Sequence, residues 1–329
     1  MYTERLVEAL REGKQVEVVE ASRSGRGPRG QGNALRSAMN AAGDRAWLHG
    51  GLPRAARAAG ADVVHHPLPA LSRGLAIPQV VTLHDAAFAA HPEGYGRAWR
   101  LIDGRLHARA VRTAGAVVCV SGATAAEAAE LLGAPRERLV VARHGPGQRL
   151  PPVSAPEGPG HLLYVGDAEP RKNVPGLLSA FAAYRAGAEH PVDLVLAGQA
   201  ATLAGADGVR GEADPPAPRL AELLAGAAAL VHPSRHEGFG LTLVEAMDAG
   251  VPVLAVSNAG VREIVGDAAL LTSADELANA IARITSDAML RERLSRAGTE
   301  RAAAFTWEES ARRHVEAYTL AREIHGRAS

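Results

Sequence analysis

Short apolar runs alternate with longer segments of helical period along most of this 329-residue chain. The short runs are rich in Val and Leu, and the segments between them are rich in Ala, Arg, Glu and Leu at helical spacing. This alternation is typical of strands that cross over through helices into parallel sheets. The sequence therefore predicts an α/β fold.

The alternation occurs twice, which predicts two domains of one architecture. A chain of 329 residues also exceeds what one hydrophobic core usually organises. The predicted strands are residues 16–20, 62–65, 80–83 and 116–120 in the first half, and 162–165, 193–197, 228–231 and 253–256 in the second. Ser121 is expected to cap the helix that follows the strand at 116–120. Each half then forms a Rossmann-like, doubly wound sheet.

A stretch dense in Pro and Gly, residues 145–160, separates the two halves. Such a stretch cannot continue a helix or a central strand, so it predicts an interdomain linker. We expect a first domain at 1–147, a linker at 148–160 and a second domain at 161–306. A long helix around 307–324 lies too far from the last strand to belong to that sheet, and we expect residues 307–329 to pack back onto the first domain.

The chain opens directly in a helical pattern, so the first sheet lacks the strand that would precede it. The first strand of a doubly wound sheet usually lies at its centre, flanked on both sides. Either the natural chain starts upstream or the sheet is rearranged, and we favour an N-terminally shortened chain.

Charge and cysteine content exclude several classes of protein. Lys plus Arg and Asp plus Glu each total 36, so net charge gives no reason to expect a nucleic-acid partner. The single Cys119 excludes an intramolecular disulfide and a cysteine zinc cluster. The N-terminus lacks the apolar core of a signal peptide, and no uncharged apolar run approaches the roughly 20 residues of a spanning helix. We expect a cytoplasmic protein for which any membrane contact is peripheral.

The segment 233–253 carries the strongest signal for a ligand site. An apolar strand ends near Val231, a glycine-containing loop follows, and a helix is expected to begin near Thr242. Unpaired N–H groups at that helix start would suit a phosphate, and the loop glycines allow a ligand to approach closely. Glu237 in the loop and Glu245 in the helix would face one crevice at the carboxyl end of the sheet, where carboxylates can accept hydrogen bonds from sugar hydroxyls. The alternative is that Thr242 and Glu245 form a capping box and Glu237 is solvated.

This segment resembles the signature of the family 4 glycosyltransferases, which have the GT-B fold of two Rossmann-like domains facing across a cleft. That signature is a pair of Glu eight residues apart within E-G-F-G-L-P-x-x-E-A-M-A-x-G-x-P-V, and Thr242 stands here in place of the usual Pro. The matching residues are Glu237, Gly238, Phe239, Gly240, Leu241, Glu245, Ala246, Met247, Gly250, Pro252 and Val253. The resemblance implies that Glu237 orients the donor sugar and acts catalytically, that Glu245 binds the nucleotide ribose, and that residues 238–241 also bind the donor.

A second match begins at Gly166, directly after the predicted strand at 162–165, and ends at Asn173. It resembles the G-x-x-x-P-R-K-N loop of the same family, in which the Lys, helped by the Arg, holds the donor diphosphate. The resemblance gives this role to Arg171 and Lys172, with Gly166 as part of the donor site. Fixed cations stabilise the negative charge that a leaving diphosphate gains. Many family members carry Arg directly after the Gly, whereas this chain has Asp167, so we expect the clamp to rely on Arg171 and Lys172.

In the first half, His84 ends a predicted strand within the sequence T-L-H-D at 82–85. It resembles the T-x-H-D of the family, which implies that His84 contacts the donor sugar near the reacting centre. Three other histidines, His65, His66 and His144, are expected to be structural, because no metal-binding spacing emerges.

Two other functions stay open. Residues 25–30 satisfy G-x-G-x-x-G after a strand candidate, as in an NAD-dependent oxidoreductase. That function needs an acid at the end of the next strand, which here ends in His65-His66, so we interpret residues 25–30 as a flexible basic loop near the acceptor. A non-catalytic sugar-nucleotide-binding or partner subunit is the second alternative, and turnover assays separate it from an enzyme.

The resemblance extends from about Tyr2 to the F-T-W at 305–307. It implies transfer of a sugar from a nucleotide diphosphate sugar to a glycosyl acceptor, with net retention of the anomeric configuration. It also implies no cofactor and no essential metal, since Arg171 and Lys172 take the part that a divalent cation plays in other transferases. The P-R-K-N form is frequent among bacterial mannosyl- and related transferases, which slightly favours a GDP-mannose-like donor.

Overall fold

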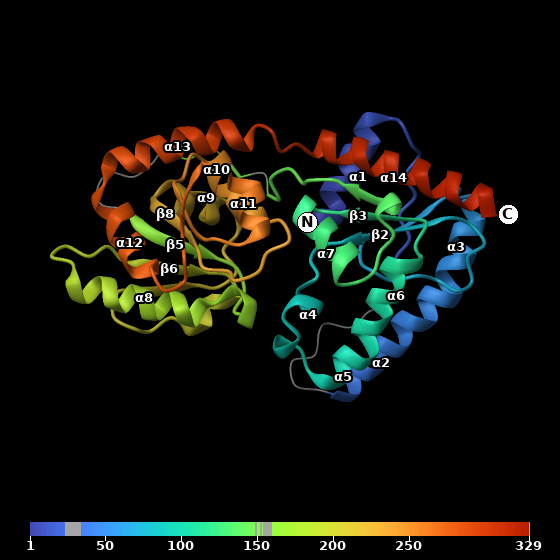
Figure 1. Ribbon diagram of the computed structural model, residues 1–329, viewed down its shortest axis with the longest axis horizontal. Coiled ribbons are helices and arrows are strands. Elements are labelled where there is room, and N and C mark those ends of the chain that lie inside the picture. Colours follow the sequence, from blue (N-terminus) through green and yellow to red (C-terminus); the bar gives the residue numbers. More distant parts are fainter. Residues whose placement is uncertain (24–33, 149, 152, 154–159, 329) are drawn as a thin grey trace.

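The computed structural model contains two parallel sheets covered by helices, the first built by the amino-terminal half and the second by the carboxyl-terminal half (Figure 1). It describes residues 1–23, 34–148, 150–151, 153 and 160–328. The predicted α/β fold with two parallel-sheet domains is confirmed. The G-x-G-x-x-G at 25–30 and most of the predicted linker at 148–160 lie outside the described residues.

The first sheet has the strand order β1-β2-β3-β4, and every pair in it is parallel. Its strands are β1 (Val64–His66), β2 (Gln79–Leu83), β3 (Ala116–Cys119) and β4 (Leu139–Val141). The strand predicted at 16–20 is wrong, because this segment joins no sheet. Val16 and Val18 alternate with exposed residues because they pack on a cluster formed by two helices. β4 was not predicted.

The second sheet has the order β10-β9-β8-β5-β6-β7 and is also parallel throughout. Its strands are β5 (His161–Val165), β6 (Leu194–Ala197), β7 (Val209–Glu212), β8 (Ala227–His232), β9 (Val253–Val256) and β10 (Ala269–Thr272). The sequence predicted the four central strands and missed the edge strands β7 and β10. Strand order reverses between β5 and β8, and ligands of such sheets bind where the loops diverge at this point.

The helices of the first domain surround its sheet. They are α1 (Tyr2–Gly13), α2 (Ala34–Ala46), η1 (Trp47–Gly51), α3 (Leu52–Ala58), α4 (Ala87–Ala90), η2 (Pro92–Gly94), α5 (Arg97–Trp99), η3 (Arg100–Gly104), α6 (Arg105–Thr113), α7 (Gly122–Glu130) and η4 (Arg136–Arg138). The predicted cap at Ser121 is confirmed, since its Oγ accepts a hydrogen bond from the backbone N–H of Thr124 at 3.0 Å.

The helices of the second domain bury both faces of its sheet. They are η5 (Pro170–Lys172), α8 (Val174–Gly187), η6 (Gln199–Leu203), α9 (Ala217–Ala225), α10 (Leu241–Asp248), α11 (Ala259–Val265), α12 (Leu277–Ser286) and α13 (Ala288–Ala302). One core cluster contains Leu243, Val244 and Val261, and the other contains Leu177, Phe181 and Ile281. The sheet is thus fixed on both sides, and its loops extend from a rigid base.

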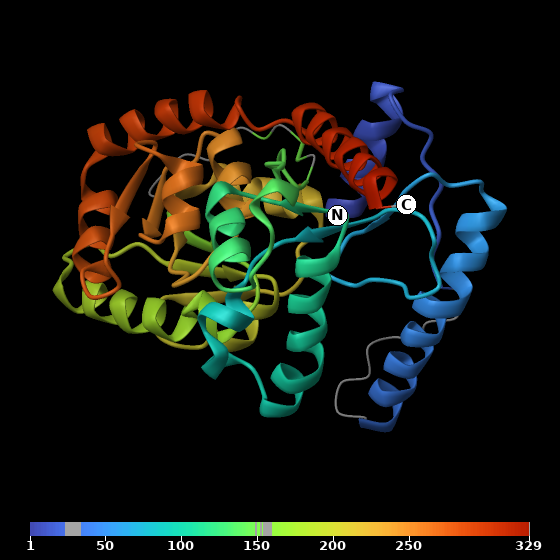
Figure 2. The same ribbon diagram turned by 45° about the vertical axis from the view of Figure 1, so that its right-hand side comes forward.

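The last helix, α14 (Trp307–Ala328), lies along the first sheet, so the chain crosses between the domains a second time. Figure 2 shows α13 and α14 following one another along the same side of the molecule. Ala317 and Ala321 let α14 approach the buried strands closely, and its start packs against Leu6 and Leu10 of α1. None of the helices in the described part of the chain combines the length and apolarity that crossing a membrane requires.

Candidate active site

The loop between β8 and α10 lies at the carboxyl edge of the second sheet. Gly240 adopts a left-handed conformation (φ 83°) and is the N-cap of α10, which has no side-chain cap. The alternative capping box of Thr242 and Glu245 is therefore wrong. The side chain of Glu237 is only 9% exposed, so it is not a solvated loop carboxylate either.

Two glycines let this loop contact its neighbours without a gap. A Cβ on Gly238 would lie 1.8 Å from the carbonyl oxygen of His84, and one on Gly260 of α11 would lie 1.9 Å from the carbonyl oxygen of Glu237. Any side chain at Gly238 would push the β8–α10 loop away from the first domain. The close approach therefore fixes Glu237 next to the end of β2.

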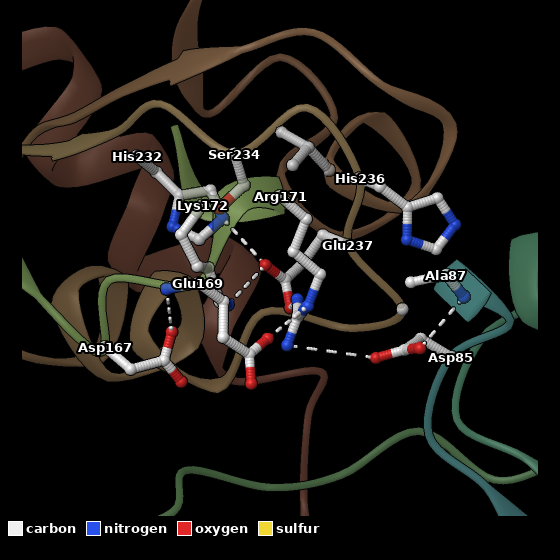
Figure 3. Close-up of polar contacts among 12 residues, drawn as sticks. Asp85, Ala87, Asp167, Glu169, Arg171, Lys172, His232, Ser234, His236 and Glu237 are labelled. Carbon is white, nitrogen blue, oxygen red and sulfur yellow. Dashed lines mark hydrogen bonds and ion pairs between the residues drawn. The ribbon is translucent and has the colours of Figure 1, made fainter. Parts of the chain in front are cut away.

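Lys172 and Arg171 reach Glu237 from the loop that follows β5 (Figure 3). Lys172 Nζ donates to Glu237 Oε2 at 2.8 Å. Arg171 Nε donates to Glu169 Oε2 at 2.8 Å, while its Nη1 lies 3.7 Å from Glu237 Oε1. Arg171 Nη2 also lies 3.9 Å from Asp85 Oδ2, which belongs to the first domain. The structure thus brings the two predicted clamp cations together with the predicted Glu237.

Glu237 is held in its ionised form. Burial alone would raise the pKa of this carboxyl, but the hydrogen bond from His232 and the charge of Lys172 outweigh burial and hold the pKa of Glu237 well below its usual range. Glu237 is therefore an acceptor of hydrogen bonds at any ordinary pH and has no proton to donate.

His84 lies at the carboxyl end of β2, as predicted, and its backbone carbonyl lies against Gly238 of the β8–α10 loop. Burial lowers the pKa of His84, so the ring is neutral and its Nε2–H donates to the carbonyl of Pro67 at 3.0 Å. The Tyr2 ring packs against it in a T-shaped arrangement, with 4.7 Å between ring centres. Asp85 Oδ1 accepts the backbone N–H of Ala87 at 3.0 Å, which fixes Asp85 opposite Arg171.

Glu245 has different surroundings from Glu237. Its Oε1 accepts the backbone N–H of Gln148 at 2.9 Å, and burial raises the pKa of Glu245 to about 7 despite that hydrogen bond. It lines a cavity of about 800 Å³ with Pro146 and Gln148, and neither Glu237 nor Lys172 lines this cavity. α10 carries Glu245 more than a turn away from the loop, next to the segment that follows β4 (residues 142–148, the connector), instead of into the shared crevice that we expected.

The other predicted donor-binding residues are Gly166, Gly238, Phe239, Gly240 and Leu241. Gly166 (φ 153°) donates its N–H to the carbonyl of Ala197 at 3.0 Å and holds the end of β5 against β6. Phe239 is 4% exposed and belongs to the core, and Leu241 packs against the same core. The side chains of Phe239 and Leu241 are therefore used in packing, so the backbone groups of this loop are the part that can contact a ligand.

The three histidines that we expected to be structural have partners within the first domain. His65 is hydrogen-bonded to Thr82 and Tyr318, His66 to Gln79, and His144 stacks on Trp307. No three His, Cys, Asp or Glu side chains in the described ranges are arranged to hold a metal ion.

α7 joins the two domains beside the site. The backbone N–H groups of Gly122 and Ala123 donate to the two carboxylate oxygens of Glu263 on α11, at 2.9 and 2.8 Å. Arg143 of the connector pairs with the same carboxylate at 2.7 Å. Farther along the helix, Thr124 donates to the carbonyl of Gly238 at 3.3 Å. Glu127 pairs with His236 at 2.8 Å.

Sequence reasoning missed His232, Glu169, Glu263 and the Glu127–His236 pair. His232 ends β8 one residue before Pro233, and a polar residue at the end of a predicted parallel strand is a signal that could have identified it. Glu263 has no such signal, because its partner α7 lies more than 130 residues away in the sequence.

Family models match both halves of the chain. The model described as "Glycosyltransferase Family 4" matches residues 1–145, and the one described as "Glycosyl transferases group 1" matches residues 150–301. O-antigen chain mannosyltransferase B of Escherichia coli is 29% identical over 267 residues, which cover 73% of this chain and 70% of that protein. A D-inositol 3-phosphate glycosyltransferase of a Nocardioides species is 31% identical over 209 residues, which cover 58% of this chain and 43% of that protein.

Solved structures show the same fold. Sucrose-phosphate synthase from Thermosynechococcus elongatus superposes with a TM-score of 0.74 at 21% identity, covering 97% of this chain and 92% of that one. WaaG, a glycosyltransferase involved in lipopolysaccharide biosynthesis, superposes with a TM-score of 0.65 at 18% identity, covering 98% of this chain and 94% of that one. The architecture is GT-B, as the sequence predicted, and the chain belongs to the family 4, or group 1, glycosyltransferases.

Proposed function

We propose that this chain is a retaining, metal-independent glycosyltransferase that moves a sugar from a nucleotide diphosphate sugar to an acceptor. The observation that carries the proposal is the convergence of Arg171 and Lys172 on Glu237, with Arg171 also near Asp85 of the first domain. Two cations from one loop suit a diphosphate, and an ionised carboxylate beside them suits the hydroxyls of the attached sugar. Family membership supports the same reaction.

The donor diphosphate would take over the cations from their present carboxylate partners. Arg171 would turn from Glu169 and Asp85 toward the phosphates, and Lys172 would bridge Glu237 and the leaving group. These fixed charges stabilise the negative charge that develops as the sugar departs, the work that a metal ion performs elsewhere. Closure of the two domains would exclude water and limit hydrolysis of the donor.

His84 would contribute an acceptor. Its Nε2–H donates to the carbonyl of Pro67, so Nδ1 of the neutral ring carries a lone pair and is a hydrogen-bond acceptor. That atom can accept a hydrogen bond from a hydroxyl of the donor sugar. To bind the ribose, Glu245 Oε1 would have to share or give up the hydrogen bond that it accepts from the N–H of Gln148.

The proposed donor is a GDP-mannose-like nucleotide sugar. The relative from Escherichia coli is called a mannosyltransferase, which supports a GDP-mannose-like donor. Direct titration with several nucleotides tests this choice.

Peripheral membrane contact, expected from the sequence, has a suitable surface on the first domain. The exposed face of the η3–α6 helix carries Leu101, Ile102, Arg105, Leu106 and Arg109, and we call it the α6 face. Its three apolar side chains are 44–56% exposed, and no carboxylate among the described residues pairs with its two arginines. Arginines mixed with exposed apolar groups suit an anionic lipid surface. Cytoplasmic location stays a prediction from the sequence.

Calorimetric titration with UDP, GDP and ADP, with and without EDTA, tests the donor site. We expect saturable, EDTA-insensitive binding of one nucleotide. Lys172→Met should weaken it by roughly tenfold or more, because a charge-assisted hydrogen bond to phosphate is lost. The matched control is Lys14→Met, since Lys14 and Lys172 are the two lysines of the chain and Lys14 lies exposed at the end of α1.

Because the chain has two lysines, NMR spectroscopy can follow the Lys172 side chain directly. Reductive ¹³C-methylation labels these two side chains and the N-terminal amine while keeping the charge of each lysine. The Lys172 methyl resonance should shift on nucleotide addition, and the Lys14 resonance should not. Absence of nucleotide binding by the folded chain would argue against the donor site, and binding without sugar transfer to any acceptor would favour the non-catalytic subunit.

A further inference from the structure

The two carboxylate oxygens of Glu237 have different partners. Oε2 receives Lys172 Nζ at 2.8 Å and His232 Nε2 at 3.2 Å. Within the described part of the chain, the polar group recorded near Oε1 is Arg171 Nη1, at 3.7 Å, which is too long for a hydrogen bond. Arg171 Nη1 itself has no hydrogen-bond partner among the described residues. Oε2 therefore accepts two hydrogen bonds, and Oε1 is left able to accept one from a ligand.

His232 is built into the sheet more rigidly than the other groups around Glu237. It is the last residue of β8, pairs in register with Ala255 of β9, and is only 3% exposed. Burial lowers the pKa of His232, so the ring is neutral, and the nitrogen that faces the carboxylate carries the proton. His232 thus donates one hydrogen bond in a direction fixed by the strand.

The two hydrogen bonds to Oε2 should respond differently when the donor diphosphate binds. Lys172 is a mobile point charge on a four-carbon stem, and the donor diphosphate competes for it in the proposed reaction. A neutral imidazole attracts a diphosphate much less, and the His232 ring lies at the end of a buried strand. Once the donor is bound, His232 is the group that still fixes the orientation of Glu237.

We propose that His232 is a positioning residue for Glu237. It holds Oε2 so that Oε1 remains directed away from the strand end and accepts a hydrogen bond from a hydroxyl of the donor sugar. This inference rests on the proposed function, because it assigns how the donor-sugar subsite is aligned. It differs from a space-filling role, in which any residue of similar volume would serve.

The test compares affinity for a nucleotide with affinity for the matching nucleotide sugar, using UDP with UDP-glucose, GDP with GDP-mannose, and ADP with ADP-glucose. His232→Phe keeps an aromatic ring of similar volume and removes the donor. We expect its affinity for the nucleotide to stay within about threefold of wild type, while the additional affinity contributed by the sugar falls roughly tenfold. His232→Gln retains an N–H donor and should recover part of that loss.

Ser234→Ala is the matched control. Ser234 lies two residues after His232 and is fully buried, and its hydroxyl has no partner among the described residues, so its removal should change neither affinity. Equal loss of nucleotide and nucleotide-sugar affinity in His232→Phe, or no loss in either, would overturn the positioning role. If the phenylalanine variant does not fold, His232→Leu replaces it in the same titrations. Failure of the proposed function would show differently, because wild type would then bind none of the nucleotides.

Discussion

Glu237 and Glu245 are eight residues apart, and their environments drive their pKa values in opposite directions. Both carboxyls are almost fully buried, which favours the neutral form. Glu237 has Lys172 and His232 as donors, and these outweigh burial. Glu245 accepts hydrogen bonds from backbone N–H groups and has no ion pair among the described residues, so burial dominates and raises the pKa of Glu245 to about 7. The ionised state of Glu237 and the raised pKa of Glu245 both follow from their neighbours.

The raised pKa of Glu245 predicts a pH dependence of stability. A carboxyl with a pKa of 4.5 when unfolded and about 7 when folded binds more protons in the folded state between these values. Its contribution is therefore fully present below about pH 4.5 and is lost as pH rises through 7, on the order of 3 kcal/mol in total. Glu245→Gln should remove this dependence. Thermal melts at pH 5 and pH 8 should then show a gain in relative stability of the variant at pH 8.

Asp248→Asn is the control for that experiment, because Asp248 lies exposed on the same helix. Its melting temperature should follow wild type at both pH values. If Glu245→Gln and wild type differ equally at pH 5 and pH 8, Glu245 is ionised in the folded protein and the interpretation is wrong.

The sequence predicted individual residues where a local motif or a strand end determined their position. Ser121 caps its helix because the cap needs only the next turn, and Glu237, Arg171 and Lys172 meet because their loops leave adjacent strands, β8 and β5. The surroundings of Glu245 could not be predicted in this way, because they depend on the path of the connector, whose Gln148 donates to Glu245. The site residues close to strand ends were thus predictable, and those that depend on tertiary contacts were not.

At the scale of elements, buried strands were predictable and edge or short strands were not. The central strands β5, β6, β8 and β9 are continuous apolar runs because both faces are covered by helices. β7 contains Arg210 and Glu212 and lies at an edge, so its composition does not separate it from a loop. The segment 16–20 gave the opposite error, because its alternating pattern arises from packing on helices and not from a sheet.

The α6 face allows a prediction about one element. α2 and the start of the η3–α6 helix extend to the same side of the first domain (Figures 1 and 2), whereas the end of α6 packs on the first sheet through Val111. Each arginine near an anionic bilayer contributes about 1 kcal/mol, and the exposed Leu and Ile side chains add burial in the headgroup region. We expect co-sedimentation with vesicles that contain phosphatidylglycerol and little with pure phosphatidylcholine. The double variant Arg105→Glu, Arg109→Glu should lower this binding at least about tenfold.

Arg293→Glu, Arg296→Glu on α13 makes the same change of charge on exposed residues of the second domain and serves as the control. Equal loss of binding in the two double variants would mean that net charge, and not the α6 face, governs attraction to the vesicles. Binding that depends on the α6 face but is stronger to RNA than to vesicles would contradict a lipid partner.

At the scale of the whole molecule, the site is assembled from two domains that meet through few polar contacts. Arg171 reaches Asp85, and α7 contributes its first N–H groups, Thr124 and Glu127. A carboxylate at a helix start is favoured because it satisfies free N–H groups and faces the positive end of the helix dipole. Glu263 thus ties α11 of the second domain to α7 of the first, with Arg143 of the connector as a third partner.

Removal of this carboxylate should favour an open arrangement of the domains. Glu263→Ala leaves the N–H groups of Gly122 and Ala123 without their acceptor and frees Arg143. An anion at a helix start contributes roughly 1–2 kcal/mol when partly buried, which corresponds to a roughly five- to thirtyfold shift toward open forms. Small-angle X-ray scattering without ligand should then give a larger radius of gyration for the variant, and nucleotide at saturation should restore the wild-type value. Glu300→Ala, which removes an exposed carboxylate on α13, should scatter as wild type does. If Glu263→Ala also scatters as wild type does, the remaining contacts of α7 and the close approach at Gly238 are sufficient to hold the domains together, and closure does not depend on this carboxylate.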